Sequence, residues 1–207
     1  DPDMNPSLRT MFQKARDNSV PLDTIEKAIK RGSGQLDGVA YEQITYEGYA
    51  PGGVALIIEV LTDNRNRSGS DVRSVFTKRG GSMAEPGAVA WQFERKGTLV
   101  VDGAADEDEL MLAAIDGGAE DVVREGDDWR VATEAADLHT TRSAIEEAGF
   151  TVRSGELTMV AQNLVPLEDA KSAKTVLDLI DALEEIDDVQ DVYGNFDLPD
   201  DVLAELA

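Results

Sequence analysis

The chain has 207 residues, no cysteine and a formal net charge of −23 at pH 7. The lack of cysteine excludes disulfide bonds, thiolate catalysis and cysteine-ligated zinc. Hydrophobic residues make up 42% of the sequence, as in globular proteins, and no apolar run approaches the roughly 20 residues that cross a bilayer. We therefore expect a soluble, cytoplasmic protein with two or three compact units.

The charge is unevenly distributed along the chain. Residues 1–96 hold 13 basic and 13 acidic side chains, whereas the remainder holds 6 basic and 29 acidic ones. The acidic second half would repel a polyanion, so a nucleic acid is expected to contact the first half. The acidic half is either a solubilising surface or a surface for a basic protein partner.

Residues 7–32 are predicted to form two short helices. Gly32 follows two cations and is expected to take a left-handed helix cap. Lys27, Lys30 and Arg31 fall on the face opposite the apolar one, where they form a basic surface or only complement the helix dipole. The apolar residues that recur at helical spacing are Leu8, Met11, Phe12, Ala15, Ile25, Ala28 and Ile29.

The glycine-rich segment 32–38 predicts a joint, and the periodicity changes beyond it. Residues 41–62 predict two strands separated by the turn "APGG". A helix follows, with Val72, Val75 and Phe76 on its apolar face, a cap at Ser68 or Ser70, and an end at Gly80. The segment "AVAWQFER", residues 88–95, predicts another strand.

From Gly97 the predicted order is strand, helix, strand, strand, helix, strand, which is the βαββαβ pattern of a ferredoxin-like sandwich. One more helix follows, with an apolar side of Val176, Leu177, Ile180, Leu183 and Ile186, and then a strand in "VQDVYGNFDL". This last pair cannot close a core alone, so it is expected to complete the unit begun before residue 96.

The predicted fold class is α+β with three domains, a small helical N-terminal domain and two α/β sandwich domains. The helical domain covers residues 1–38. A discontinuous α/β domain covers residues 39–96 and 164–207, and the βαββαβ domain, residues 97–163, is inserted into it.

Signatures of catalysis and of cofactor binding are missing from the sequence. The one histidine, His139, lies near a predicted helix start and is expected on the surface. There is no nucleophile elbow, Walker loop or dinucleotide fingerprint. Acidic runs such as residues 106–109 and 184–188 are too abundant to indicate an acid/base pair, and they lack the spacing of an EF-hand. We predict that the chain is not an enzyme and uses no cofactor or metal.

The segment "DNRNR", residues 63–67, is the candidate phosphate site. It is expected in a loop between an apolar strand and a helix, beside helix N–H groups that favour anions. The guanidinium groups of Arg65 and Arg67 would bind phosphate oxygens, while Asn64 and Asn66 would donate to phosphate, sugar or base oxygens. In the alternative interpretation these residues have a structural role only. The asparagines favour the turn, and an arginine pairs with Asp63, Asp71 or Glu59.

Three aromatic residues also bear on nucleic-acid binding. Tyr46, Tyr49 and Trp91 could stack on bases. Aromatic residues in strands are more often part of the core, so both interpretations stay open.

Three segments carry a family resemblance: "IEKAIKRGSG", "YEQITYEGYAPGGVALIIEVLTDNRNRSGSDVRSVFTKRGGSM" and "GAVAWQFERKG". Together they closely resemble the YebC/PmpR family, which also includes the mitochondrial translational activator of cytochrome c oxidase subunit I. The match is strong over residues 5–100 and collinear to the end, and "YEGYAPGG" and "LTDNRNR" are its most diagnostic parts. The resemblance implies a helical N-terminal domain and two α/β domains, one of them discontinuous.

Members of that family are described as DNA-binding transcriptional regulators, and some as ribosome-associated factors that help translation through stretches such as consecutive prolines. Neither description implies an enzyme. Members usually begin with a basic segment that this chain lacks, so we expect weaker nucleic-acid binding than in a chain that has it. We infer that polar positions matching the family's motifs contact nucleic acid: Lys27, Lys30, Arg31, Asn64, Arg65, Asn66, Arg67, Arg73, Lys78 and Arg79.

The leading prediction is a nucleic-acid-binding regulator of gene expression that acts on duplex DNA. The alternative is a ribosome-associated translation factor whose first half contacts ribosomal RNA, and the charge distribution suits this slightly better. No clear helix-turn-helix with a polar reading face is visible. A protein-only interaction module or an unrecognised enzyme is the third possibility.

Overall fold

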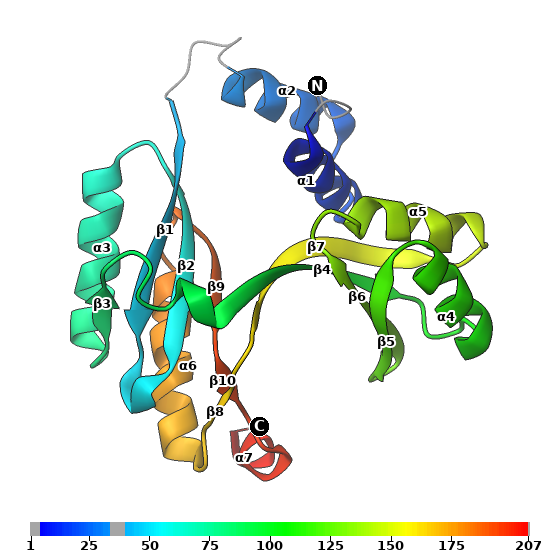
Figure 1. The fold of residues 1–207 in the computed structure, drawn as a ribbon. Helices are drawn as coiled ribbons and strands as arrows, with labels where there is room; N and C mark the ends of the chain where they lie inside the picture. Colours follow the sequence, from blue (N-terminus) through cyan, green and yellow to red (C-terminus); the bar gives the residue numbers. More distant parts are fainter. Residues whose placement is uncertain (1–4, 34–39, 207) are drawn as a thin grey trace. The chain divides into compact units, whose positions relative to one another are not determined.

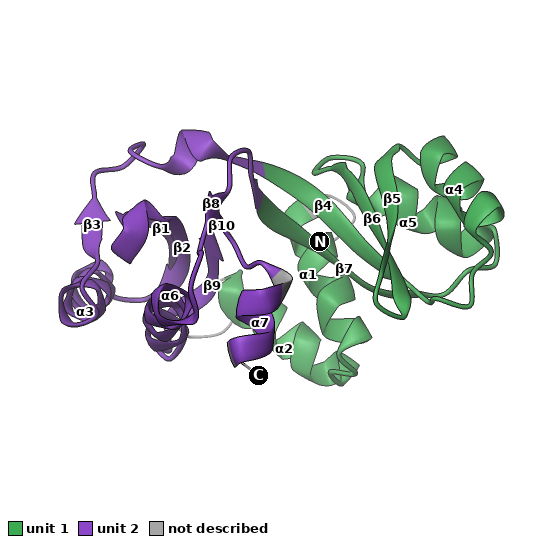
Figure 2. Ribbon diagram, turned by 90° about the horizontal axis from the view of Figure 1, so that it is seen from below, with its two compact units in different colours: residues 1–36, 95–159 green, residues 37–94, 160–207 purple. Residues whose placement is uncertain are grey.

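The computed structural model of the chain describes residues 5–33 and 40–206 (Figure 1). The chain forms two compact units, residues 1–36 with 95–159 and residues 37–94 with 160–207 (Figure 2). Each unit combines helices with a four-stranded sheet, so the predicted α+β class is confirmed. The division into three domains stays a prediction, and most of the predicted joint at 32–38 lies outside the described residues. Within the described ranges, no helix combines the length and the apolar character that a membrane span requires.

Two helices begin the first unit, α1 (Pro6–Asp17) and α2 (Leu22–Gly32). Asn5 caps α1, because its side-chain oxygen accepts a hydrogen bond from the N–H of Leu8 at 3.1 Å. The left-handed cap predicted at Gly32 is wrong. Gly32 is the last residue of α2, and the capping residue Ser33 has a φ of −84°.

The rest of the first unit is the predicted βαββαβ sandwich. Its sheet has the order β5-β6-β4-β7, and β6 pairs antiparallel with both β5 and β4. Helices α4 and α5 pack against each other (Figure 1) and bury Leu110 and Ile145 in a core with Leu99 and Val131. The bounds are β4 Phe93–Val101, α4 Glu107–Asp116, β5 Ala119–Glu125, β6 Asp128–Glu134, α5 Leu138–Glu147 and β7 Val152–Ala161.

The second unit is a sheet with two helices on one face (Figure 2). The strand order is β3-β1-β2-β9 with antiparallel pairing throughout. Alternate residues of β2, Leu56, Ile58 and Val60, point into one core with Phe76 and Leu179 of the two helices. The bounds are β1 Glu42–Tyr49, β2 Ala55–Thr62, α3 Arg65–Lys78, β3 Ser82–Ala84, α6 Ala170–Glu184 and β9 Val189–Gly194.

Several short elements of the second unit had no clear signal in the sequence. Strand β8 (Val165–Pro166), strand β3 and helix α7 (Asp200–Leu206) are examples. The turn predicted at "APGG" is confirmed as the 3-10 turn η2 (Pro51–Gly53), whereas the single strand predicted in "VQDVYGNFDL" is divided into β9 and β10 (Phe196–Asp197), and β10 pairs parallel with β8. Helix α6 ends at Glu184, so Ile186 lies beyond it rather than on its apolar side, although it still packs against the core.

The strand predicted over residues 88–95 is wrong in its first half. Residues Ala90–Gln92 form a 3-10 turn, η3, and β4 then runs unbroken from Phe93 to Val101. The two strands predicted on either side of Gly97 are therefore one strand.

The cause of this turn is the carboxylate of Glu47 in β1, which is 6% exposed. It accepts hydrogen bonds from the backbone N–H groups of Gly87, Val89 and Ala90 at 2.6, 2.7 and 2.9 Å. Burial raises the pKa of Glu47, but these three bonds outweigh burial and hold the pKa below its usual value. Three donors converging on one carboxylate require a curled backbone, which an extended strand would not supply.

A buried ion pair joins α1 to α5 within the first unit. The Arg142 guanidinium donates to both oxygens of Asp17, at 2.8 and 3.0 Å, and through Nε to Glu146 at 2.9 Å. The side chains of Arg142 and Asp17 are 8% and 9% exposed. Burial lowers the pKa of Arg142, but the bonds to Asp17 and Glu146 outweigh it, so the pKa is raised and the charge is retained.

The Asp17–Arg142 pair should respond non-additively to mutation. We expect Asp17→Ala to lower the free energy of unfolding by about 3–5 kcal/mol, because it leaves a buried cation without its partner. The double variant Asp17→Ala, Arg142→Met should be less destabilised than Asp17→Ala alone, since it removes the cation as well. Urea unfolding followed by circular dichroism measures both. Lys14→Ala, which breaks the half-exposed pair with Glu156, is the control and should cost less than about 1 kcal/mol. If the double variant loses as much free energy of unfolding as Asp17→Ala alone, or more, the role given to the pair is contradicted.

Candidate nucleic-acid interface

The first group of predicted contacts lies on the outer face of α2. Lys27, Lys30 and Arg31 are all exposed there. Lys27 lies 3.6 Å from Asp23 in an exposed pair, whereas Lys30 and Arg31 form no ion pair within the described residues. Because exposed pairs of this kind contribute little, this face offers cations that a phosphate can bind without breaking internal contacts.

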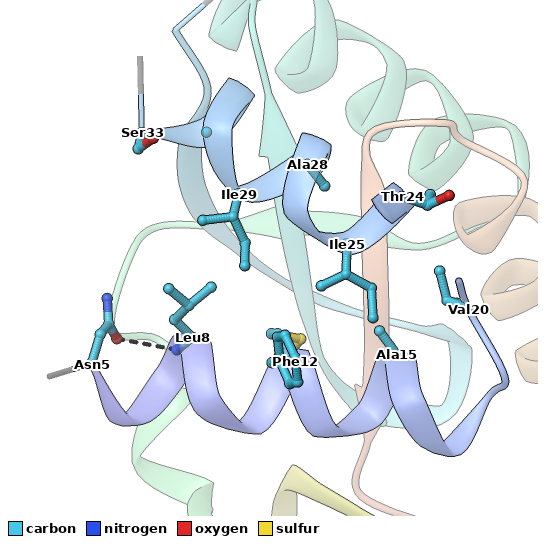
Figure 3. A pocket seen from close by; sticks show the side chains of 12 residues that line it. Asn5, Leu8, Phe12, Ala15, Val20, Thr24, Ile25, Ala28, Ile29 and Ser33 are labelled. Atoms are coloured by element: carbon cyan, nitrogen blue, oxygen red, sulfur yellow. Dashed lines mark hydrogen bonds between the residues drawn. The ribbon is translucent and has the colours of Figure 1, made fainter. Parts of the chain in front are cut away.

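An apolar groove of about 600 Å³ separates α1 from α2 (Figure 3). Leu8 and Phe12 of α1 face Ile25 and Ile29 of α2 across it. The groove does not suit a phosphate, because its lining is mostly aliphatic and aromatic. The anion-binding surface predicted on α2 is therefore its outer face and not this groove.

The second group lies in the first turn of α3. Asn64 caps the helix, since its Oδ1 accepts the N–H of Arg67 at 3.1 Å. Arg65, Asn66 and Arg67 are therefore helical, so the loop predicted for "DNRNR" is confirmed for Asp63 and Asn64 only and is wrong for the other three residues. The cap predicted at Ser68 or Ser70 is also wrong. The side chains of Asn64 to Arg67 are exposed.

Arg67 is held by two carboxylates of its own chain. Its Nη2 donates to Asp63 at 2.8 Å and to Asp188 at 2.8 Å. Hydrogen bonds to Asp188 and then Asp63 raise the pKa of Arg67. Three further acids, Asp71, Glu185 and Asp187, line the surrounding pocket. This geometry favours the structural alternative for Arg67, with Asp188 as the main partner, because carboxylates already occupy the positions that phosphate oxygens would take.

Asp188 connects three segments of the second unit. Besides Arg67, it accepts hydrogen bonds from Ser68 Oγ at 2.6 Å and Thr62 Oγ1 at 3.0 Å. The bonds from Ser68, Arg67 and Thr62 outweigh burial and lower the pKa of Asp188. Its role could not be predicted from the sequence, because the run "EEIDD" gave no sign of which acid faces α3.

Arg65 and Arg73 lie on one side of α3 at a spacing of two turns. The Arg65 guanidinium is 3.7 Å from Glu42, and both side chains are exposed. Between the two arginines, the Tyr46 hydroxyl donates to the carbonyl of Arg65 at 3.2 Å. Burial raises the pKa of Tyr46, and the positive charges of Arg65 and Arg73 oppose this. These residues form a small cationic surface with a phenol at its centre.

The third group is at the end of α3. Lys78 and Arg79 are exposed, and in the described ranges neither they nor Arg73 form an ion pair. Lys78 is about 20 Å from Arg65, given a rise of 1.5 Å per residue. The ten predicted contacts therefore form three groups: the outer face of α2, the start of α3 and the end of α3.

The three aromatic candidates differ in their surroundings. Tyr46 packs against the core of the second unit. Tyr49 is half-buried and its hydroxyl lies 3.4 Å from the carbonyl of Ala88. Trp91 is 66% exposed, with its indole N–H donating to the same carbonyl, so a core position for Trp91 is wrong.

The described residues hold no group of three or more His, Cys, Asp and Glu side chains that could bind a metal ion. His139 is exposed, as predicted.

Two family models match the chain. The model described as TACO1/YebC second and third domain matches residues 41–196, and the model described as TACO1/YebC protein N-terminal domain matches residues 1–35. Together they account for most of the sequence.

Curated relatives and one solved structure are similar over nearly the whole chain. Proteins named probable transcriptional regulatory protein from Rubrobacter xylanophilus and Halothermothrix orenii are 53% and 51% identical, over all of this chain and 83% of each relative. The crystal structure of a conserved hypothetical protein from Aquifex aeolicus has a TM-score of 0.86 and 41% identity, covering 97% of this chain and 83% of that one.

Stability should depend on pH through Asp188. Its pKa is lowered in the folded state, so its contribution is present above the unfolded value near 3.9 and is lost as pH falls through the folded value. We expect Asp188→Asn to lower the free energy of unfolding by about 1–3 kcal/mol at pH 7, because an amide N–H₂ cannot accept from Ser68 or Arg67. The difference from wild type should shrink below about pH 3. Asp187→Asn, at the exposed neighbouring acid, should change stability by less than about 0.5 kcal/mol. Equal effects of the two substitutions in chemical denaturation across pH would contradict the role of Asp188.

Proposed function

The chain belongs to the TACO1/YebC family, and on this premise we propose that it is a nucleic-acid-binding regulator of gene expression that acts on duplex DNA. The names of the relatives, probable transcriptional regulatory proteins, support regulation of transcription.

The observation that carries the proposal is the contrast between paired and unpaired cations. Lys30, Arg31, Arg73, Lys78 and Arg79 are exposed and form no ion pair among the described residues. Several other cations are neutralised internally, as in Lys96 with Glu120 and Glu134 and Arg153 with Asp102 and Asp128. Arg16 and Lys171 are also exposed and form no ion pair in the described ranges, but they occur singly. Exposed cations left without acids in an acidic protein are suited to phosphate.

The geometry supports contact with the phosphate backbone rather than base reading by α2. Recognition helices of the helix-turn-helix type place the residues of their N-terminal end against base edges. In α2 that end carries Asp23 and Glu26, while the cations lie toward the C-terminal end. Binding is therefore expected to be strongly salt-dependent.

The charge distribution favours a second candidate, a ribosome-associated translation factor. Residues 97–207 hold 29 acidic and 6 basic side chains, which duplex DNA would repel at long range. A ribosome presents both RNA phosphates and basic proteins, so it could accept both halves of this chain.

Removing unpaired cations should weaken nucleic-acid binding without loss of folding. We expect the double variant Lys30→Ala, Arg31→Ala and the triple variant Arg73→Ala, Lys78→Ala, Arg79→Ala each to bind a duplex more weakly. The slope of log affinity against log salt should fall by about 0.9 for each phosphate that the variant no longer neutralises. Fluorescence anisotropy with a promoter duplex and a random duplex across a salt series measures this.

Lys171→Ala, Lys174→Ala is the charge-matched control for the double variant, because both lysines are exposed on α6 and are not among the predicted contacts. Arg67→Ala is avoided, since it would disturb Asp188. If the control and the test variants lose affinity equally, binding follows net charge and the assigned residues are refuted. If wild type prefers no duplex but sediments with purified ribosomes, the second candidate replaces the first.

A further inference from the structure

Helix α4 of the βαββαβ sandwich presents an apolar stripe to solvent. Leu112 is 66% exposed, Ile115 58% and Met111 36%. Ile115 follows Met111 by four residues and Leu112 by three, so the three side chains lie on one face of the helix. Leu110 and Ala114, on the opposite side, are buried in the core. The stripe is therefore additional to the apolar face that folding requires.

This stripe differs from the other exposed apolar side chains of the protein. In the described part of the chain, the remaining ones occur singly or in pairs on separate segments, for example Met11, Trp91 and Leu203. Single exposed apolar residues are ordinary, whereas a contiguous group with a polar border is typical of an interaction surface.

The border of the stripe is acidic. Asp108 lies one turn before Met111 and Leu112 on the same face, and Glu107, Glu109 and Asp116 flank it. Helix α4 contains no basic residue. All four acids are exposed.

The cations within residues 95–159 are occupied. Residues 95–159 hold 16 acidic and 6 basic side chains. Arg130 pairs with Glu125, Arg142 with Asp17, and Arg124 binds backbone carbonyls and covers the Trp129 ring at 5.0 Å. The acidic excess around α4 is therefore available to a partner.

We propose that the exposed face of α4, defined by Met111, Leu112, Ile115 and their acidic border, is a docking surface for a basic protein segment with apolar anchor residues. Its chemistry is that of an amphipathic helix whose lysines or arginines meet the acids while its apolar side covers the stripe. A second copy of this chain fits poorly, because a symmetric contact would place the same acids opposite one another. A nucleic acid is excluded by the same charges. The proposal is independent of the proposed function, and its test contains no nucleic acid.

The test uses two synthetic helical peptides of about 14 residues with amphipathic spacing, one of leucine and lysine and one of leucine and glutamate. Isothermal titration calorimetry with the whole chain should show binding of the lysine peptide only. The variant Leu112→Ser, Ile115→Ser should weaken this binding by about tenfold or more. Val160→Ser, Leu164→Ser is the matched control, because both residues are similarly exposed and lie in the other unit. The control should bind like wild type.

The contribution of the acidic border is tested with the variant Asp108→Asn, Asp116→Asn. This variant should bind the lysine peptide several-fold more weakly and with a smaller salt dependence. This variant also keeps the proposal testable if the serine variant does not fold. Equal binding by the variants and wild type would overturn the proposal, as would tight binding of the glutamate peptide. Self-association of wild type in sedimentation that the serine variant abolishes would assign the stripe to a second copy instead.

Discussion

The carboxylate of Asp188 sets the geometry around the start of α3. It accepts hydrogen bonds from Thr62 at the end of β2 and from Ser68 and Arg67 in α3, while its own position is just before β9. Three hydrogen-bond donors compensate the desolvation of this largely buried carboxylate, and the carboxylate in turn fixes the segments that supply the donors. One consequence is that Arg67, the last residue of the diagnostic motif "LTDNRNR", stabilises the fold. A phosphate contact in this region would then be left to exposed neighbours such as Arg65, Asn66 and Arg73.

In the other unit, the ion pair of Asp17 and Arg142 likewise fixes the segments that it joins. Each partner is buried, and the guanidinium satisfies both oxygens of the aspartate and one of Glu146. Such pairs contribute modest net stability but penalise every arrangement in which they are separated. Helix α1 is therefore fixed to α5, and the basic face of α2 belongs to the same compact unit as the acidic sandwich. The charge asymmetry seen along the sequence is thus not an asymmetry between the compact units.

The sequence predicted elements well where periodicity was strong, and side-chain roles poorly where they depend on distant partners. The βαββαβ order and the apolar face of α3 followed from spacing alone. The turn at Ala90–Gln92 could not be predicted, because a carboxylate some forty residues earlier, Glu47, causes it. The role of Arg67 depended likewise on Asp188, 121 residues away. In both cases the local pattern alone was insufficient, because the partner that determines the structure or the role is remote in the sequence.

These cases suggest a physical rule for locating function in an acidic protein. Net charge is a poor guide to the position of a binding site, because cations and acids that pair with each other are not available to a ligand. What counts is which charges lack an internal partner and what surface lies beside them. On α3 the charges without an internal partner are cationic and lie around Arg73, beside polar side chains, which suits phosphate. On α4 they are anionic and border exposed leucine and isoleucine, which suits a basic protein. A regulator with both surfaces could hold a nucleic acid and a protein at once, since their charge requirements keep each ligand off the other's site.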